Sequence, residues 1–185
     1  MLDTRNIMDH IKGIDADRIK LLYNQQALPF AVCVVNLAGG LNTGMIMRTS
    51  NAMGAKEVFY LGNKQFDRRS AVGVQNYLTI RYLKTLDELK KLKSQYRLVG
   101  IENNIPNVKS IYSYTPYTKS LFIFGEEGCG IDKEILDMCD DKVYVPQTGT
   151  VRSLNVSSCA AIVMADYVQK RKTFKFKMIN WWREK

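Results

Sequence analysis

Three short stretches of the sequence contain polar and glycine residues that a plain structural core does not need. The first motif (residues 41–54) begins Leu-Asn-Thr-Gly-Met-Ile-Met-Arg and closes with Asn-Ala-Met-Gly. The second motif (124–131) is Phe-Gly-Glu-Glu-Gly-Cys-Gly-Ile. The third motif (145–157) is Val-Pro-Gln-Thr-Gly-Thr-Val-Arg-Ser-Leu-Asn-Val-Ser. In the second motif, glycines flank a pair of carboxylates. Because glycine permits positive φ and close backbone approach to a ligand, this motif indicates a binding loop. The alternative is a plain strand-to-helix turn.

Several familiar kinds of site are excluded by the residue patterns. GxGxxG is absent after every predicted strand, and no Gly-Lys-Ser/Thr follows a glycine run, so neither common phosphate-binding loop is expected. The cysteines (Cys33, Cys129, Cys139 and Cys159) form no CxxC pair, and His10 is the only histidine. A zinc site is therefore improbable, and no metal is expected. The thiols should be reduced, as in a cytoplasmic protein.

The elements that must position these motifs follow from hydrophobic patterning. Strands are expected at residues 30–35, 56–61, 79–83, 97–101, 121–124 and 142–145, and helices at about 5–26, 43–53, 85–96, 132–139 and 153–171. Short continuous apolar runs are typical of strands buried on both faces of a parallel sheet. The alternation predicts an α/β fold, a mainly parallel sheet flanked by helices. Ligands of such sheets bind outside the carboxyl ends of the strands, where Ile101, Gly125 and Val145 are expected.

Composition and charge are those of a globular protein with a polyanionic partner. The chain has 185 residues, 46% of them hydrophobic, and a net charge of +9, which together favour a single domain and an anionic partner. No apolar run approaches the roughly 18–20 residues of a membrane span, and no signal peptide is visible. We therefore expect no membrane partner and a cytoplasmic location.

The positive charge is concentrated at the C-terminal end. Residues 168–185 carry seven of the basic residues against one acid, interleaved with Phe174, Phe176, Trp181 and Trp182. Basic and aromatic residues in alternation suit RNA, where cations pair with phosphates and rings stack on bases. The alternative is a tail whose aromatic side chains pack on the body of the protein.

In this order, the three motifs resemble the signature motifs of the SpoU-type branch of the SPOUT RNA methyltransferases. The resemblance spans about residues 30–170, and its most specific part is the third motif, a strand and Pro146 followed by Ser-Leu-Asn-Val-Ser. It implies an enzyme that uses S-adenosylmethionine to methylate a ribose 2′-hydroxyl of RNA. It also implies a homodimer whose sites use residues of both subunits and a deep C-terminal trefoil knot. The implied division is an N-terminal helical segment (1–28), a methyltransferase domain (29–171) and a basic aromatic tail (172–185).

The resemblance is closer to the tRNA-type members than to the smallest ones. Residues 66–70 with 75–76, and Pro146-Gln147 ahead of Arg152-Ser153, are the segments that indicate this. A tRNA substrate is therefore favoured, with a D-arm guanosine among the candidate targets. An rRNA methyltransferase and a non-catalytic RNA-binding member are the alternatives. Glu126 stands where the family usually has Asn, Ser or Pro, which leaves fine specificity open.

The resemblance implies catalytic roles by position. Arg48 matches the position credited with activating the hydroxyl. Because free arginine has a pKa above about 12, we expect it to act as a cation that holds a phosphate and stabilises the developing alkoxide. Asn42 would fix Arg48 or the target ribose, and Glu127 would orient Arg48 through a charge-assisted pair. Ser153 and Asn155 complete the expected set, although Ser153 at a helix start is also explained as an N-cap.

The implied cofactor site uses backbone at the ends of strands. Backbone groups of Ile101, Gly125, Val145 and Leu154 would bind the adenine and ribose of S-adenosylmethionine. The side chains of Ile101 and Leu154 would sandwich its apolar surface. Taken alone, each residue is better explained as ordinary core, and only its location at the strand ends favours the cofactor role. RNA phosphates are expected at the basic residues Arg68, Arg69, Arg152, Lys170, Arg171 and Lys172.

Overall fold

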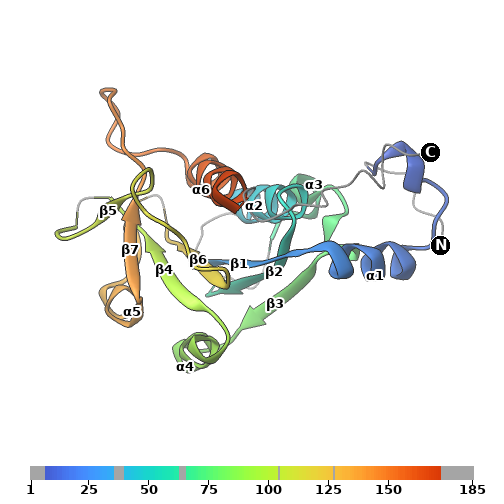
Figure 1. The fold of residues 1–185 in the computed structure, drawn as a ribbon, viewed down its shortest axis with the longest axis horizontal. Helices are drawn as coiled ribbons and strands as arrows, with labels where there is room; N and C mark the ends of the chain where they lie inside the picture. Colours follow the sequence, from blue (N-terminus) through green and yellow to red (C-terminus); the bar gives the residue numbers. More distant parts are fainter. Residues whose placement is uncertain (1–6, 36–39, 63–65, 104, 127, 172–185) are drawn as a thin grey trace.

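The computed structural model describes residues 7–35, 40–62, 66–103, 105–126 and 128–171 (Figure 1). Its strands form one parallel sheet in the order β3-β2-β1-β6-β4-β7-β5. The strands are β1 (Leu28–Val35), β2 (Ala55–Leu61), β3 (Thr79–Leu83), β4 (Arg97–Ile101), β5 (Lys109–Ser110), β6 (Ser120–Phe124) and β7 (Asp141–Tyr144). The predicted α/β fold with a mainly parallel sheet is confirmed.

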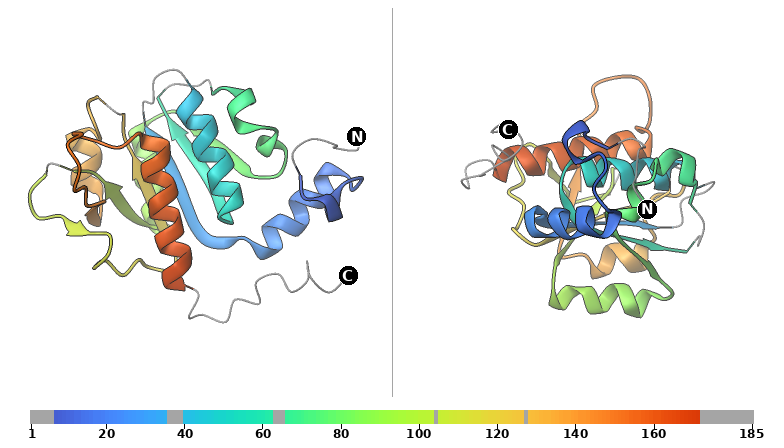
Figure 2. Two further views of the ribbon diagram at one scale, coloured as in Figure 1. Left: turned by 90° about the horizontal axis from the view of Figure 1, so that it is seen from above. Right: turned by 90° about the vertical axis from the view of Figure 1, so that its right-hand side faces the viewer.

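Helices cover both faces of this sheet. The helices are α1 (Ala16–Gln26), α2 (Leu41–Ala52), α3 (Arg68–Ala71), α4 (Leu86–Lys91), α5 (Lys133–Met138) and α6 (Val156–Arg171), with 3-10 turns η1 (Asp9–Ile11), η2 (Val74–Asn76) and η3 (Leu92–Ser94). Figure 1 shows α2, α3 and α6 on one face and α4 and α5 on the other. Figure 2 shows α2 and α6 side by side, which their contacts confirm.

Alternate residues of the central strand belong to two separate cores. Val32 and Val34 of β1 pack with Ile46 of α2 on one face. Cys33 of the same strand packs with Leu89 of α4 on the other. Side chains of a strand point alternately to opposite faces, so a strand covered by helices on both sides must be apolar throughout, as the sequence of β1 is.

Two predicted helices begin later than the sequence indicated. The expected helix from residue 5 is divided into η1 and α1, with Gly13 between them at φ 82°, and α1 begins after Asp15, whose carboxylate accepts from the backbone N–H of Asp17 at 2.9 Å. The last helix was expected from Ser153. It begins at Val156, because the carbonyl oxygen of the Asn155 side chain caps its first turn.

Two other features complete the fold. The two-residue strand β5 was missed because Lys109-Ser110 carries no apolar signal. Among the helices that the structure describes, none combines the length and the apolarity that crossing a membrane requires.

Candidate active site at the carboxyl ends of the strands

The second and third motifs meet at one edge of the sheet. In the strand register, Ile101 at the end of β4 pairs with Phe124 of β6 and with Val143 of β7. All three strands are parallel, so the segments that follow them leave the sheet side by side. We call this place the carboxyl edge. It is where ligands of open α/β sheets bind.

The glycine loop of the second motif is folded back on itself. Glu126 and Gly130 exchange backbone hydrogen bonds of 3.1 and 2.8 Å. Of its three glycines only Gly130 has a positive φ, 73°. A Cβ atom on Gly125 would lie 2.2 Å from the carbonyl oxygen of Gly130, whereas one on Gly128 would meet nothing within 4 Å. Gly125 is therefore required by close packing inside the loop, not by a positive φ as the sequence suggested.

Glu102 is a candidate site residue that no motif of the sequence indicates. It directly follows β4, and its carboxylate accepts from the backbone N–H of Ile131 at 2.9 Å and from that of Asn103 at 2.8 Å. A Cβ atom on Gly130 would lie 2.3 Å from Oε2 of Glu102. Glu102 therefore joins the end of β4 to the glycine loop. Its only signal in the sequence is a carboxylate directly after a buried strand.

The first and third motifs are joined by a hydrogen bond between two carboxamides. Asn155 Nδ2 donates to Asn42 Oδ1 at 3.1 Å, across 113 positions of sequence. Asn155 Oδ1 also accepts from the backbone N–H groups of Ser157, at 3.0 Å, and Ser158, at 3.3 Å. Asn155 is thus the N-cap of α6, not a residue inside the helix as predicted. Ser153 lies before the cap and is exposed.

Arg48 lies on the exposed face of α2, away from the carboxyl edge of its own sheet. It is seven positions after Leu41, or about 10 Å along the helix axis. It lines an apolar cavity of about 620 Å³ together with Leu28 and Gly54, which lie at the amino ends of β1 and β2. Glu127 lies outside the described residues, so its pairing with Arg48 stays a prediction.

The four residues expected at the cofactor all flank the carboxyl edge. Ile101 and Val145 are buried, with 7% and 3% of their surface exposed, and both belong to the core between the sheet and α6. Leu154 packs partly buried against the same core and precedes α6 rather than opening it. Because the side chains of Ile101 and Val145 are buried in the core, their backbone groups are the parts that could face a ligand, whereas the partly buried side chain of Leu154 could also contribute.

The first motif also positions a pair of exposed arginines. Gly44 of α2 faces the start of α3, where a Cβ atom on Gly44 would lie 2.6 Å from the carbonyl oxygen of Asp67. Glycine therefore lets α3 approach α2. This places Arg68 and Arg69 on the surface, and Arg69 pairs with Asp67 at 3.0 Å. Arg152 of the third motif is also exposed.

The two described basic residues at the end of α6 are bonded to a loop. Lys170 donates to the carbonyl oxygen of Tyr114 at 2.9 Å and pairs with Asp166 at 2.8 Å. Arg171 donates to the carbonyl oxygen of Pro116. Contacts of these side chains with RNA phosphates would compete with these bonds. Lys172 lies outside the described residues.

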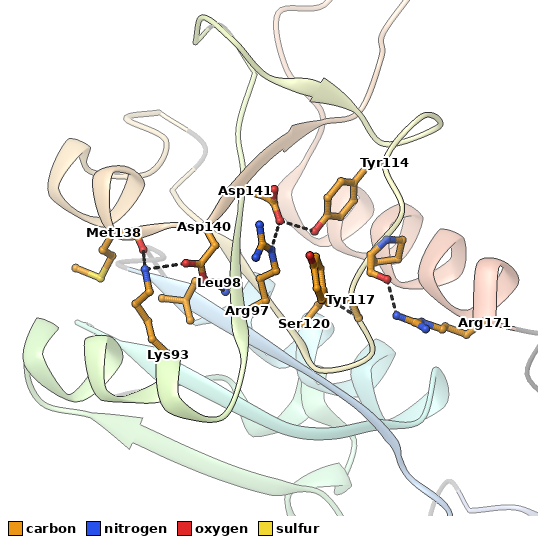
Figure 3. A network of polar contacts seen from close by, with 11 residues as sticks. Lys93, Arg97, Leu98, Tyr114, Tyr117, Ser120, Met138, Asp140, Asp141 and Arg171 are labelled. Atoms are coloured by element: carbon orange, nitrogen blue, oxygen red, sulfur yellow. Dashed lines mark hydrogen bonds and ion pairs between the residues drawn. The ribbon is translucent and has the colours of Figure 1, made fainter.

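The same loop is anchored to the amino ends of the strands by a polar network (Figure 3). Arg97 pairs with Asp141 at 2.6 Å and lies over the ring of Tyr117 at 4.3 Å, while the hydroxyl of Tyr114 donates to Asp141 at 3.0 Å. The hydrogen bond from Arg97 lowers the pKa of Asp141 below its ordinary value, and that from Tyr114 adds to the effect. This network lies opposite the carboxyl edge and is structural.

A buried acceptor at the carboxyl edge has no protein partner. Gln147 follows β7 by three residues, and its Oε1 atom is buried with no hydrogen bond to the described chain. No group of three or more His, Cys, Asp or Glu side chains within the described ranges could hold a metal ion. Backbone groups beside buried apolar side chains, together with one unsatisfied carboxamide, suit a nucleoside better than a metal. The residues present therefore fit an S-adenosyl cofactor.

Comparison with known proteins agrees with these features. The model of the SpoU rRNA methylase family matches residues 29–165. The tRNA (guanosine(18)-2′-O)-methyltransferase of Escherichia coli K12 is 28% identical over 148 residues, which cover 76% of this chain and 63% of that protein. The 23S rRNA (guanosine-2′-O-)-methyltransferase RlmB of Neisseria meningitidis is 26% identical over 160 residues, covering 82% and 62%. The chain thus spans about three fifths of the length of these curated relatives.

Solved structures show the same fold. The A. aeolicus TrmH/SpoU tRNA modifying enzyme superposes with a TM-score of 0.74 at 19% identity, over 85% of this chain and 83% of that one. The SpoU methyltransferase AviRb from Streptomyces viridochromogenes, in complex with AdoMet, gives 0.70 at 21% identity, over 79% and 59%. Since the family model covers most of the sequence and the fold agrees, this chain belongs to the SpoU rRNA methylase family.

Proposed function

We propose that this protein transfers a methyl group from S-adenosylmethionine to a ribose 2′-hydroxyl of RNA. The observation that carries the proposal is the 3.1 Å hydrogen bond between Asn42 and Asn155. It joins the first motif to the third at the carboxyl edge, beside the glycine loop of the second. Family membership and the 2′-O-methyltransferase names of the relatives support the same reaction.

The cofactor would be held by backbone groups of Ile101, Gly125, Val145 and Leu154. When bound, it supplies a methyl group already activated by the sulfonium sulfur, so the reaction requires no metal. Glu102 supports this site by fixing the glycine loop. The protein's remaining task is to hold the ribose in line with the methyl group and to stabilise the alkoxide that forms.

Arg48 would supply that cation in a homodimer. Within one subunit it lies about 10 Å along α2 from the first motif's start, so the site is best completed by Arg48 of a second copy. Support comes from apolar side chains that are exposed on α2 and α6 and could be covered by a second copy. Leu41 of α2 is 54% exposed, Met45 of α2 is 43% exposed and Ile162 of α6 is 37% exposed. Leu41, Met45 and Arg48 are spaced at helical intervals and share one face. Ser153 and the Asn42–Asn155 pair would position the ribose.

The substrate class we favour is tRNA over rRNA. Exposed Arg68, Arg69 and Arg152 could contact phosphates, and the relatives include enzymes named for both RNAs. A cytoplasmic location fits the free thiols, of which Cys129 is exposed in the glycine loop.

We also propose that residues 29–171 form a methyltransferase domain with a trefoil knot. From β7 the chain returns across the carboxyl ends of β4 and β6, so that α6 packs on α2. A deep knot is rare enough that only the family resemblance prompts it.

The test is methyl transfer from labelled S-adenosylmethionine to total tRNA and, separately, to rRNA, followed by nucleoside analysis. The expected product is a 2′-O-methylnucleoside, more abundant in tRNA. A parallel purification from cells that do not express this chain is the control for a contaminating enzyme. Cofactor binding without transfer to either RNA would favour a non-catalytic RNA-binding member, and a base-methylated product would contradict the assignment.

A further inference from the structure

Gln147 carries the one buried side-chain nitrogen or oxygen atom of the third motif that lacks a partner among the described residues. Its Oε1 atom has less than 1 Å² of exposed surface and accepts no hydrogen bond. A buried carbonyl oxygen without a donor costs free energy, so such atoms are rare in native proteins and call for an explanation. We propose that the carboxamide of Gln147 recognises the adenine of S-adenosylmethionine, with Oε1 accepting from the exocyclic N6 amine. This inference rests on the proposed function.

A carboxamide is chemically matched to the edge of adenine. It presents an acceptor and a donor side by side, and adenine presents the N6 amine beside the ring acceptor N7 or N1. Hypoxanthine, which carries an oxygen in place of the amine, would set an acceptor against Oε1. Gln147 therefore distinguishes adenine from its deaminated form, which contacts with the apolar faces of the ring cannot do.

The position of Gln147 favours a small ligand over an RNA base. It lies two residues after Val145, which is 3% exposed and packs in the same core as Ile101. Apolar walls with a single polar group are typical of sites for a flat aromatic ring. The residues that follow, 148–153, are all exposed, and these are the ones that RNA could reach.

A matched control exists in the same chain. Gln75 Oε1 is the other buried side-chain oxygen without a partner among the described residues. Gln75 lies in η2, which precedes the amino end of β3. In the sheet, β3 is the outermost strand on one side, whereas β7 is next to the outermost strand on the other side. Gln75 therefore also has a buried side-chain oxygen without a hydrogen-bond donor, but it lies far from the carboxyl edge.

The experiment compares Gln147→Met, Gln147→Glu and Gln75→Met in the full chain. Binding of S-adenosylhomocysteine and of its deaminated analogue, S-inosylhomocysteine, is measured by calorimetry, and the melting temperature is measured without ligand. Gln147→Met should bind S-adenosylhomocysteine about tenfold more weakly, as expected for one lost hydrogen bond. Its affinity for S-inosylhomocysteine should barely change. Gln147→Glu keeps the acceptor and should keep the preference for adenine.

Stability separates recognition from a structural role. Removing an unsatisfied acceptor should raise the melting temperature of both methionine variants by about 2–4 °C. Only Gln147→Met should lose affinity, and Gln75→Met should bind as the wild type does. Equal loss for both nucleosides in Gln147→Met would overturn the proposal. So would unchanged nucleoside affinity accompanied by a raised KM for RNA, which would assign Gln147 to the RNA. If the wild-type protein binds neither nucleoside, the proposed function itself fails.

Discussion

Polar side chains at the carboxyl edge hold backbone segments in place. Glu102 accepts from Ile131 in the glycine loop, and Asn155 accepts from the first turn of α6 while it donates to Asn42. A site whose ligand contacts are mostly backbone depends on where loops are held, so these side chains act on binding through position. Their removal should therefore lower cofactor affinity and stability together.

Glu102 provides a direct test of this reasoning. Glu102→Ala leaves the N–H groups of Asn103 and Ile131 without their acceptor, which should cost about 1–3 kcal/mol of the free energy of unfolding. The loosened glycine loop should also weaken S-adenosylmethionine binding. Glu102→Gln keeps one carbonyl oxygen but sets an amide N–H against the second backbone donor, so it should recover only part of both losses. Urea unfolding and calorimetry are the measurements, and an alanine variant that binds the cofactor with wild-type affinity would contradict the role.

Arg48 should affect the chemical step and not cofactor binding. Loss of one electrostatic donor at a developing alkoxide lowers the rate by roughly 10²- to 10³-fold, and we expect this of Arg48→Ala with an unchanged Kd for S-adenosylmethionine. Arg69→Ala, which removes an exposed arginine already paired with Asp67, is the control and should alter only RNA affinity. Single-turnover kinetics at saturating RNA make the distinction. Wild-type turnover in Arg48→Ala would remove it from the mechanism.

Asp141 should make stability depend on pH in the acid range. Arg97 holds the pKa of this carboxyl below its ordinary value of 3.8, so the unfolded chain takes up a proton first as the pH falls. The stabilisation is complete well above pH 4 and is lost as the pH falls through the lowered pKa of the folded state. Asp141→Asn should be less stable than the wild type by about 1 kcal/mol at pH 7, because the pair is partly exposed.

Urea unfolding at a series of pH values tests this. The difference between Asp141→Asn and the wild type should shrink as the pH falls below 4. Asp137→Asn is the control, because the Asp137–Lys133 pair is largely exposed. A stability difference that stays constant down to pH 2 would show that charge at position 141 does not matter.

At the scale of elements, the glycine loop should respond to substitution at one glycine and not at another. A Cβ atom at Gly125 would lie 2.2 Å from a backbone oxygen, and one at Gly128 would meet nothing within 4 Å. Gly125→Ala should therefore destabilise the protein and weaken S-adenosylmethionine binding, whereas Gly128→Ala should be close to wild type in both. The melting temperature of each variant measures its stability, and calorimetry measures its affinity for S-adenosylmethionine. Equal effects of the two substitutions would contradict the close packing at Gly125.

The order of elements could be predicted from the sequence because it depends on hydrophobic pattern. Continuous apolar runs identified β1 and β6 as buried on both faces, and the alternation with helices identified a parallel sheet. The exact helix starts could not be predicted, because they depend on which side chain caps. Asn155 and Ser153 are both acceptable N-caps, and the structure shows that Asn155 is the residue whose side chain accepts from the first turn of α6.

The candidate site was predicted where it depends on motifs and missed where it depends on tertiary contact. Strand order brings Gly125, Val145 and Ile101 to one edge, as parallel topology requires. Glu102 and Gln147 stand out only once burial and hydrogen-bond partners are known. The resemblance placed Arg48 with the other motifs, but α2 follows β1 and so begins at the carboxyl edge, and Arg48 lies about 10 Å along its axis from the first residue of the helix.

At the scale of the whole molecule, the basic tail should contribute to the binding of RNA. Residues 173–185 contain four basic residues and one acid, together with both tryptophans of the chain. If the basic residues contact phosphates, deleting the segment should weaken RNA binding and flatten its salt dependence. Each lost contact with single-stranded RNA changes the slope of log K against log salt by about 0.7. S-adenosylmethionine binding should be unchanged.

Two variants separate this role from packing of the tail on the body. Lys175→Gln with Lys177→Gln removes charge and keeps every aromatic residue, and Trp181→Ala with Trp182→Ala does the reverse. Phosphate contact predicts that the lysine variant flattens the salt slope at unchanged melting temperature. Packing predicts that the tryptophan variant lowers the melting temperature while the lysine variant binds RNA normally. Because Lys170 and Arg171 are already bonded to the 111–118 loop, they should not replace the lost cations, so a deletion that leaves the salt slope unchanged would exclude the tail from RNA binding.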